Sequence, residues 1–244
     1  MWAEPHREAT TMCNKKVNSY TLTVSGTRID LELPTPDMFN IDDISHALGN
    51  VNRFNGNLPI PYSVAQHSVM VSHLVPEEHA LAALLHDASE SVLCDIPTPV
   101  KQILPHSMNV CDRIVEAFEA CSLSPKVKAD MLALLGDASV RKVLALALPG
   151  YADLEARIQG TIHEAFGLPR ELDAETVAYI KLADARALAT EKRDLFWVDD
   201  GEWPNLVGVV PAEKRIVAFS GAAATDMFRR RYNEIMQARA LQAA

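Results

Sequence analysis

Cysteine is scarce in this sequence and is not spaced for pairing. The 244 residues include only Cys13, Cys94, Cys111 and Cys121, and no two of them form a CxxC pair. Small proteins stabilised by disulfides have many closely spaced cysteines, so this class is excluded. We expect reduced thiols that pack as small hydrophobic side chains in a cytoplasmic protein.

Long apolar runs and excess positive charge are also missing. No stretch of 18 apolar residues occurs, and the first residues lack the apolar core of a secretory signal, so we expect neither a membrane span nor export. Lys and Arg number 23 against 32 Asp and Glu, which gives a formal net charge of -9. This charge argues against binding to nucleic-acid polymers or to anionic membranes. If the ligand is an anion, nearby cationic side chains or a metal ion would have to offset the negative charge of the protein.

The remaining composition is that of an ordinary globular protein, with 48% hydrophobic and 23% charged residues. The chain shows no internal repeat, low-complexity segment or domain-sized linker. We predict a loose tail over residues 1–18 and a single domain over 19–244. Its core spans 41–195, with an N-terminal hairpin and a C-terminal helix as additions.

The spacing of apolar residues predicts an all-α fold with one small β-hairpin. Apolar and polar residues alternate over 20–33 around the turn Ser25-Gly26. Helical spacing then begins at Asn40, and a helix from Pro76 runs through Ala88 towards the break at Pro97. The other predicted helices cover about 41–53, 63–75, 107–122, 125–148, 151–166, 173–195 and 222–244, with 197–219 as an ordered loop or short extended pieces.

One stretch, residues 84–101, combines an apolar helix with several polar side chains. It places His86 and Asp87 side by side, adds Glu90 one turn later and Asp95 beyond, and breaks at Pro97 and Pro99. A continuous helix would hold His86, Asp87 and Glu90 within one arc of its surface. Burying these groups is costly, and a divalent cation would offset that cost because it neutralises acids and accepts an imidazole ligand.

Two further residues of the same type lie on apolar stripes of other helices. His67 shares a face with Val64 and Val71, and Asp184 shares one with Ile180 and Ala187. Each position alone is weak evidence for a metal site, because a single inward-facing histidine is more often a hydrogen-bonded core residue. Helical bundles, however, build metal sites by taking one or two ligands from each of several helices. Two imidazoles and two carboxylates suit Mn, Co, Zn, Fe or Mg, and four protein ligands leave coordination positions open.

The order His67, His86-Asp87, Asp184 resembles the H…HD…D signature of the HD-domain metal-dependent phosphohydrolases. The local sequence is closer still to the branch of bacterial 5′-deoxynucleotidases and phage deoxynucleotide phosphohydrolases. Residues 62–68 (YSVAQHS), 86–90 (HDASE), 95–101 (DIPTPVK) and 183–184 (AD) carry this similarity, which covers about 41–191. The HD dipeptide alone is common, whereas the HDASE and DIPTPVK runs in this order are specific.

The resemblance implies a role for each matching position. His67, His86, Asp87 and Asp184 would hold one divalent cation. Catalytic roles fall to Glu90 and Asp95, which would position or deprotonate the attacking water, and Asp95 would also contact the sugar or phosphate. Arg53 matches an arginine that lies against the nucleotide, but its aromatic neighbour in the family, a tryptophan, is Phe54 here. Lys101 is a candidate phosphate contact or else a solvated surface lysine. The other histidines, His6, His46, His73, His79, His106 and His163, carry no match, and His163 is predicted to lie at the surface.

The implied reaction is hydrolysis of a (deoxy)nucleoside 5′-monophosphate to nucleoside and phosphate. Two alternatives remain open: a triphosphohydrolase that releases triphosphate from a dNTP, and a nucleotide-binding regulator without turnover. Cyclic-dinucleotide hydrolysis is disfavoured because the chain lacks the Gly-Tyr-Pro extension of that HD branch. HD nucleotidases of this kind are often oligomers, so we expect a homo-oligomer.

Overall fold

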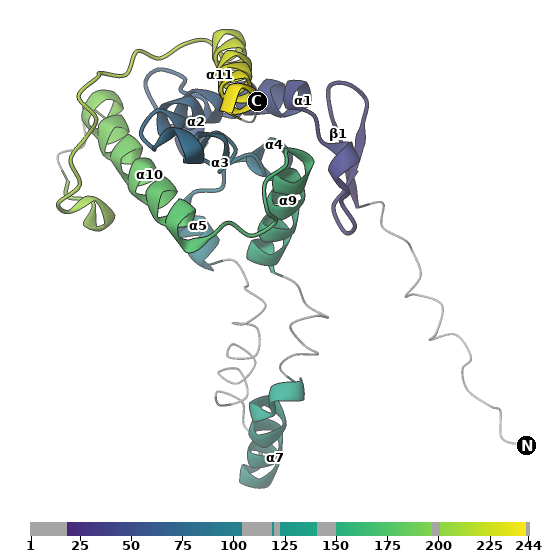
Figure 1. Ribbon diagram of the computed structural model, residues 1–244. Coiled ribbons are helices and arrows are strands. Elements are labelled where there is room, and N and C mark those ends of the chain that lie inside the picture. The colour runs from purple at the N-terminus through teal and green to yellow at the C-terminus, as the bar shows by residue number, and fades with distance from the viewer. Residues whose placement is uncertain (1–18, 104–118, 120–122, 141–149, 197–200, 243–244) are drawn as a thin grey trace, which may run out of the picture.

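The computed structural model describes residues 19–103, 119, 123–140, 150–196 and 201–242 (Figure 1). The described chain is mostly helical with a two-stranded antiparallel hairpin near its start, as the sequence predicts. The predicted tail at 1–18 and nearly all of the predicted helix at 107–122 lie outside the described residues. None of the described helices is long and apolar enough to cross a lipid bilayer.

The hairpin consists of β1 (Tyr20–Leu22) and β2 (Arg28–Asp30), with Thr21 opposite Ile29. It is fastened to the first helix by a buried acid, since the backbone N–H and the hydroxyl of Ser25 donate to the two oxygens of Asp43 at 3.0 and 2.6 Å. The hairpin is therefore attached to one side of the helical body (Figure 1).

The helices follow the predicted order. The α-helices are α1 (Ile41–Asn50), α2 (Val64–Ser72), α3 (Ala80–Leu84), α4 (Glu90–Leu93), α5 (Thr98–Ile103), α7 (Pro125–Gly136), α9 (Tyr151–Ala165), α10 (Ala174–Leu195) and α11 (Gly221–Gln242). Short 3-10 turns are η1 (Pro36–Met38), η2 (Arg53–Gly56), η3 (Glu77–His79) and η4 (Pro204–Leu206). Polar N-caps start α1, α2, α7 and α10, because the side chains of Asn40, Ser63, Ser124 and Asp173 accept backbone N–H groups.

Two predicted helices are wrong in their extent. The helix expected from Pro76 to Pro97 is divided into η3, α3 and α4, and residues 85–89 between α3 and α4 form hydrogen-bonded turns. The helix expected over 125–148 ends at Gly136, since Asp137 is extended and its carboxylate accepts the backbone N–H of Ser139 and Val140. An aspartate that binds the backbone ahead of it favours a new helix start over continuation. Residues 141–149 lie outside the described part of the chain.

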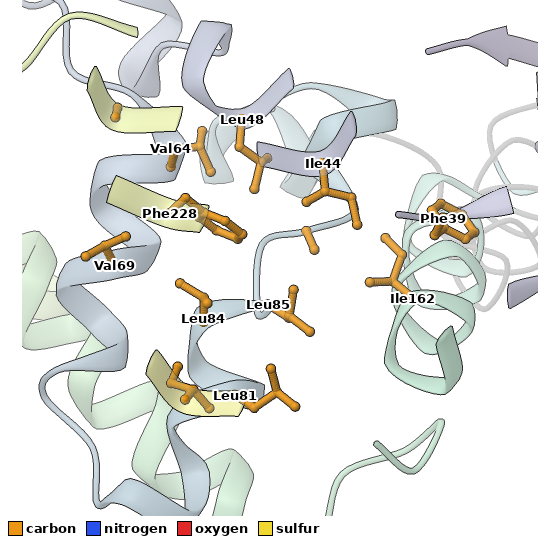
Figure 2. Packing of buried hydrophobic residues seen from close by; sticks show 14 of the residues in the cluster. Phe39, Ile44, Leu48, Val64, Val69, Leu81, Leu84, Leu85, Ile162 and Phe228 are labelled. Atoms are coloured by element: carbon orange, nitrogen blue, oxygen red, sulfur yellow. The ribbon is translucent and has the colours of Figure 1, made fainter. Parts of the chain in front are cut away.

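The core forms where α11 lies across α1, α2 and α3. Phe228 of α11 is fully buried and packs among Leu48 of α1, Val64 and Val69 of α2, and Leu84 (Figure 2). Burying a phenylalanine side chain stabilises a fold by about 1.5–3 kcal/mol. This cluster fixes α2, the helix that carries His67, between α11 and α3.

Two glycines allow α1 and α11 to cross closely. A Cβ atom on Gly49 would lie 2.8 Å from the carbonyl oxygen of Gly221, and one on Gly221 would lie 2.5 Å from that of Gly49. Real Cβ atoms do not approach other atoms so closely, so any larger residue at either position would force the two helices apart.

Candidate metal centre

Side chains from α2 and from the turn after α3 meet at one point of the helical body. One ligand-type atom from each of His67, His86 and Asp87 lies within 4.8 Å of the other two. A metal–ligand bond is about 2.0–2.2 Å long, so ligand atoms on opposite sides of one ion are about 4 Å apart. The spacing of this group is close to that span, and the group could hold a metal ion.

The two imidazoles present unused nitrogen atoms to this point. The Nε2 atoms of His67 and His86 are both buried and make no hydrogen bond within the described residues. Asp87 Oδ2 is 3.1 Å from Nε2 of His86 and 3.6 Å from Nε2 of His67, but neither contact has hydrogen-bond geometry. Buried polar atoms are rarely left unpaired, so two such atoms side by side call for a missing partner. A cation is a partner that would satisfy both nitrogens and the carboxylate together.

Asp184 reaches the same place from α10. Its Oδ1 atom lies 3.2 Å from Nε2 of His67, although it is outside the group of three whose ligand atoms are all mutually close. The carboxylate is half-exposed. The structure therefore brings together the four residues that the sequence singles out, three of them tightly and Asp184 at the more open edge.

The break in the helix at 85–89 has a specific support. Gln159 of α9 donates its amide N–H to the carbonyl oxygen of Leu85 at 2.7 Å, and its amide oxygen accepts the backbone N–H of Ser89 at 2.9 Å. An α-helix through these residues would have paired those backbone groups internally. Gln159 also contacts Nε2 of His163 at 2.9 Å, and His163 is buried, so its predicted surface position is wrong.

Glu191, one residue that the sequence analysis misses, is central to the site. It lies on α10 two turns after Asp184, it is fully buried, and one oxygen is 2.6 Å from Nδ1 of His67. Its other oxygen accepts from Nε and Nη2 of Arg53 at 3.3 and 3.1 Å. The spacing of seven residues from Asp184 places both acids on the same helix face, and this signal was available in the sequence.

Arg53 and Phe54 are adjacent in the sequence, but their side chains contact different groups. The Arg53 side chain is only 11% exposed, and its Nη1 atom lies 3.7 Å from Oδ2 of Asp87. Phe54 adopts a positive φ of 56°, and its ring meets that of Phe196 edge to face at 4.8 Å and lies near Trp203. Positive φ is strained for an aromatic residue, at a cost of about 1–3 kcal/mol. The structure thus points Arg53 at the ligand cluster and places Phe54 in an aromatic group beside it.

The remaining predicted residues lie on α4, on α5 and in the loop between them. Glu90 is buried at the start of α4, and its Oε2 atom has no hydrogen-bond partner within the described residues. Lys101 of α5 lies 4.0 Å from the other Glu90 oxygen but pairs more closely with Glu155 of α9, at 2.6 Å. Asp95 is half-buried and follows Cys94, whose φ of 65° turns the chain sharply after α4.

Burial and charge shift the acidity of these groups in opposite directions. Burial and Arg53 lower the pKa of His67, but Glu191 and Asp184 outweigh them and raise it to about 9. Burial would raise the pKa of Asp87, yet His86, His67 and Arg53 hold it well below its usual range. Burial, followed by the charges of Asp87 and Asp95, raises the pKa of Glu90 to about 9. The site thus contains carboxylates whose pKa values are lowered, those of Asp87, Asp184 and Glu191, beside the Glu90 carboxyl, which retains its proton at neutral pH.

Two proteins of known sequence resemble this chain over most of its length. The uncharacterized protein YfdR of Escherichia coli is 32% identical over 222 residues, which cover 91% of this chain and 98% of YfdR. This chain belongs to the same protein family as YfdR. The uncharacterized protein RCAP_rcc00048 of Rhodobacter capsulatus is 32% identical over 194 residues, 76% of this chain and 77% of that protein. No model of a known protein family matches the chain.

Proposed function

We propose that this protein is an HD-type, divalent-metal-dependent phosphohydrolase that hydrolyses (deoxy)nucleoside 5′-monophosphates to nucleoside and phosphate. The observation that carries the proposal is the convergence of His67, His86 and Asp87, with two buried imidazole nitrogens that have no hydrogen-bond partner in the described part of the chain. The HDASE and DIPTPVK runs that resemble the deoxynucleotidase branch supply the reaction class.

The donor set fits a divalent cation. His67 and His86 would bind through Nε2, and Asp87 and Asp184 through carboxylate oxygens, which are the ligands that Mn, Co, Zn, Fe and Mg accept. A cation bound there would lower the pKa of water and polarise a phosphoryl oxygen. No thiolate lies within this group, so there is no ligand that favours a soft metal.

The other residues supply binding and proton transfer. Arg53, whose guanidinium faces Asp87, and Lys101 would offset the charge of the phosphate oxygens. Glu90 is buried next to this group, and its Oε2 atom has no hydrogen-bond partner within the described residues, so it is placed to accept or donate the transferred proton. Asp95, a half-buried acid, would orient water or the sugar. Phe54 would stack on the base or sugar.

The decisive experiment is a panel of nucleotides combined with a panel of metals, read by phosphate release. We expect orthophosphate from dAMP and related monophosphates when Mn²⁺ or Co²⁺ is supplied. Triphosphate released from dATP would indicate the triphosphohydrolase instead. Nucleotide binding without turnover under every metal would contradict a hydrolytic function.

A further inference from the structure

Glu191 connects two side chains that have different tasks in the proposed reaction. It is a wholly buried carboxylate, in contact with the ligand-type residue His67 through one oxygen and with Arg53 through the other. A buried carboxylate is costly, and ion pairs of this kind are often no better for stability than hydrophobic residues of the same size. A role in the site explains the pair better than stability does.

The contact with His67 determines which ring nitrogen is free. A carboxylate only accepts hydrogen bonds, so Nδ1 of His67 must carry the proton that lies between it and Glu191. In a neutral imidazole, the lone pair is then on Nε2, the atom that faces Asp184 and Asp87. His86 shows the same arrangement with a different acceptor, because its Nδ1 lies 2.8 Å from the carbonyl oxygen of Ala83.

The contact with Arg53 determines where its guanidinium points. Glu191 engages Nε and Nη2, which leaves Nη1 directed to Asp87. The planar fork of a guanidinium fixes its plane once two of its donors are held. A single carboxylate therefore orients both the imidazole and the cationic group beside the ligand cluster.

We infer that Glu191 is a positioning residue that presents His67 as an Nε2 metal ligand and aims Arg53 at the substrate phosphate. The inference rests on the proposed function, since it presumes that a cation occupies the cluster. Partners of metal-bound histidines of this kind typically change metal affinity 10–100-fold when they are removed.

The test is a titration of the chelator-treated protein with Co²⁺ alone, followed by visible absorption and by calorimetry. We expect Glu191→Gln to weaken Co²⁺ affinity about 10–100-fold and to change the absorption band, because one imidazole is no longer held in place. Glu175→Gln, an exposed substitution on the same helix, is the matched control and should leave both unchanged. Wild-type affinity and an unchanged band in Glu191→Gln would overturn the inference.

A second variant separates position from charge and from folding. Arg53→Met combined with Glu191→Leu removes one positive and one negative charge, so the net charge at the site stays the same. It also avoids an unpaired buried ion, so the chain should fold. We expect the same 10–100-fold loss of Co²⁺ affinity, since His67 has no acceptor. Wild-type Co²⁺ affinity in this double variant would show that Glu191 acts only through its charge, and this would overturn the inference. Wild-type protein that binds no Co²⁺ would instead refute the proposed function.

Discussion

The two sides of the candidate metal centre differ in how far their ion pairs are closed to solvent. The arginine flank, made of Arg53, Glu191 and His67, is almost closed to solvent, and every charge in it lies against an opposite one. The lysine flank, made of Glu90, Lys101 and Glu155, has two acidic residues beside one cation, and its Lys101–Glu155 pair is partly exposed. A closed side suits the holding of ligands, and a side with a partly exposed ion pair suits the exchange of water and substrate.

The difference also shows in the strength expected of each ion pair. The side chains of Arg53 and Glu191 are 11% and 0% exposed, whereas those of Lys101 and Glu155 are 30% and 28% exposed. Removing one partner from a buried pair leaves an uncompensated charge, while a solvent-accessible pair is screened by water. Of the two flanks, the arginine flank is therefore the one that anchors a candidate ligand, because Glu191 holds His67.

The largest effect is expected where the two flanks meet, at Asp87. Its carboxylate contacts both imidazoles and lies 3.7 Å from Arg53. Asp87→Ala should abolish both metal retention and hydrolysis, because the cluster loses a carboxylate that lies close to both histidines. Metal content by elemental analysis and phosphate release from dAMP check this. Normal turnover with full metal loading would place the site elsewhere.

Arg53→Met should destabilise the chain strongly. Glu191 would remain fully buried with His67 as its remaining partner among the described residues, at a cost of about 3–5 kcal/mol in the free energy of unfolding. Urea denaturation of the metal-free protein measures this. A loss below about 1 kcal/mol would show that the arginine flank is as solvated as the lysine flank, and the contrast between them would fail.

Glu90→Gln should change how stability depends on pH. The folded chain raises the pKa of Glu90 from 4.5 to about 9, so the folded state binds that proton more tightly than the unfolded state does. Its contribution to stability is complete below pH 4.5 and is lost as the pH rises towards 9. In chelator-treated protein at pH 8, the free energy of unfolding of the glutamine variant should exceed that of the wild type by about 1–3 kcal/mol. Thermal unfolding across pH 4–9 checks this, and parallel curves for the two proteins would contradict it.

The smallest effect on stability is expected at Lys101. Lys101→Met removes an ion pair with Glu155 that is partly exposed, so unfolding should become easier by about 1 kcal/mol or less. If Lys101 contacts substrate phosphate, the KM for nucleotide should nevertheless rise. Denaturation and steady-state kinetics on the same preparation separate the two. An unchanged KM would leave Lys101 as the solvated surface residue of the alternative interpretation.

The sequence predicted the elements well, and it predicted the contacts between them less well. Apolar periodicity and polar caps placed the hairpin, α1, α2, α9, α10 and α11 within a few residues of their observed bounds. Periodicity did not show the break at 85–89, because the apolar residues Leu84, Leu85 and Ala88 continue a helical pattern across it. The break depends on Gln159, which lies about 70 residues away, and no local pattern reveals such a partner.

The candidate site shows the same division. His67, His86, Asp87 and Asp184 were recognisable because ionisable side chains on apolar stripes need a partner. Glu191 stands on such a stripe too, but its role depends on the distances to His67 and Arg53, which only the folded chain provides. The ion pair between Lys101 and Glu155 could not be predicted either. The two residues lie on α5 and α9, and no pattern in the sequence indicates that these two helices approach each other.

The side chain of Gln159 has a consequence for sequence variation. It must donate at one end and accept at the other to satisfy the backbone of Leu85 and Ser89, and it must be long enough to reach both from α9. Glutamate lacks the donor, lysine lacks the acceptor, and asparagine is one carbon shorter. A substitution at 159 should therefore survive in relatives only together with a rebuilt loop at 85–89, so the two regions should covary.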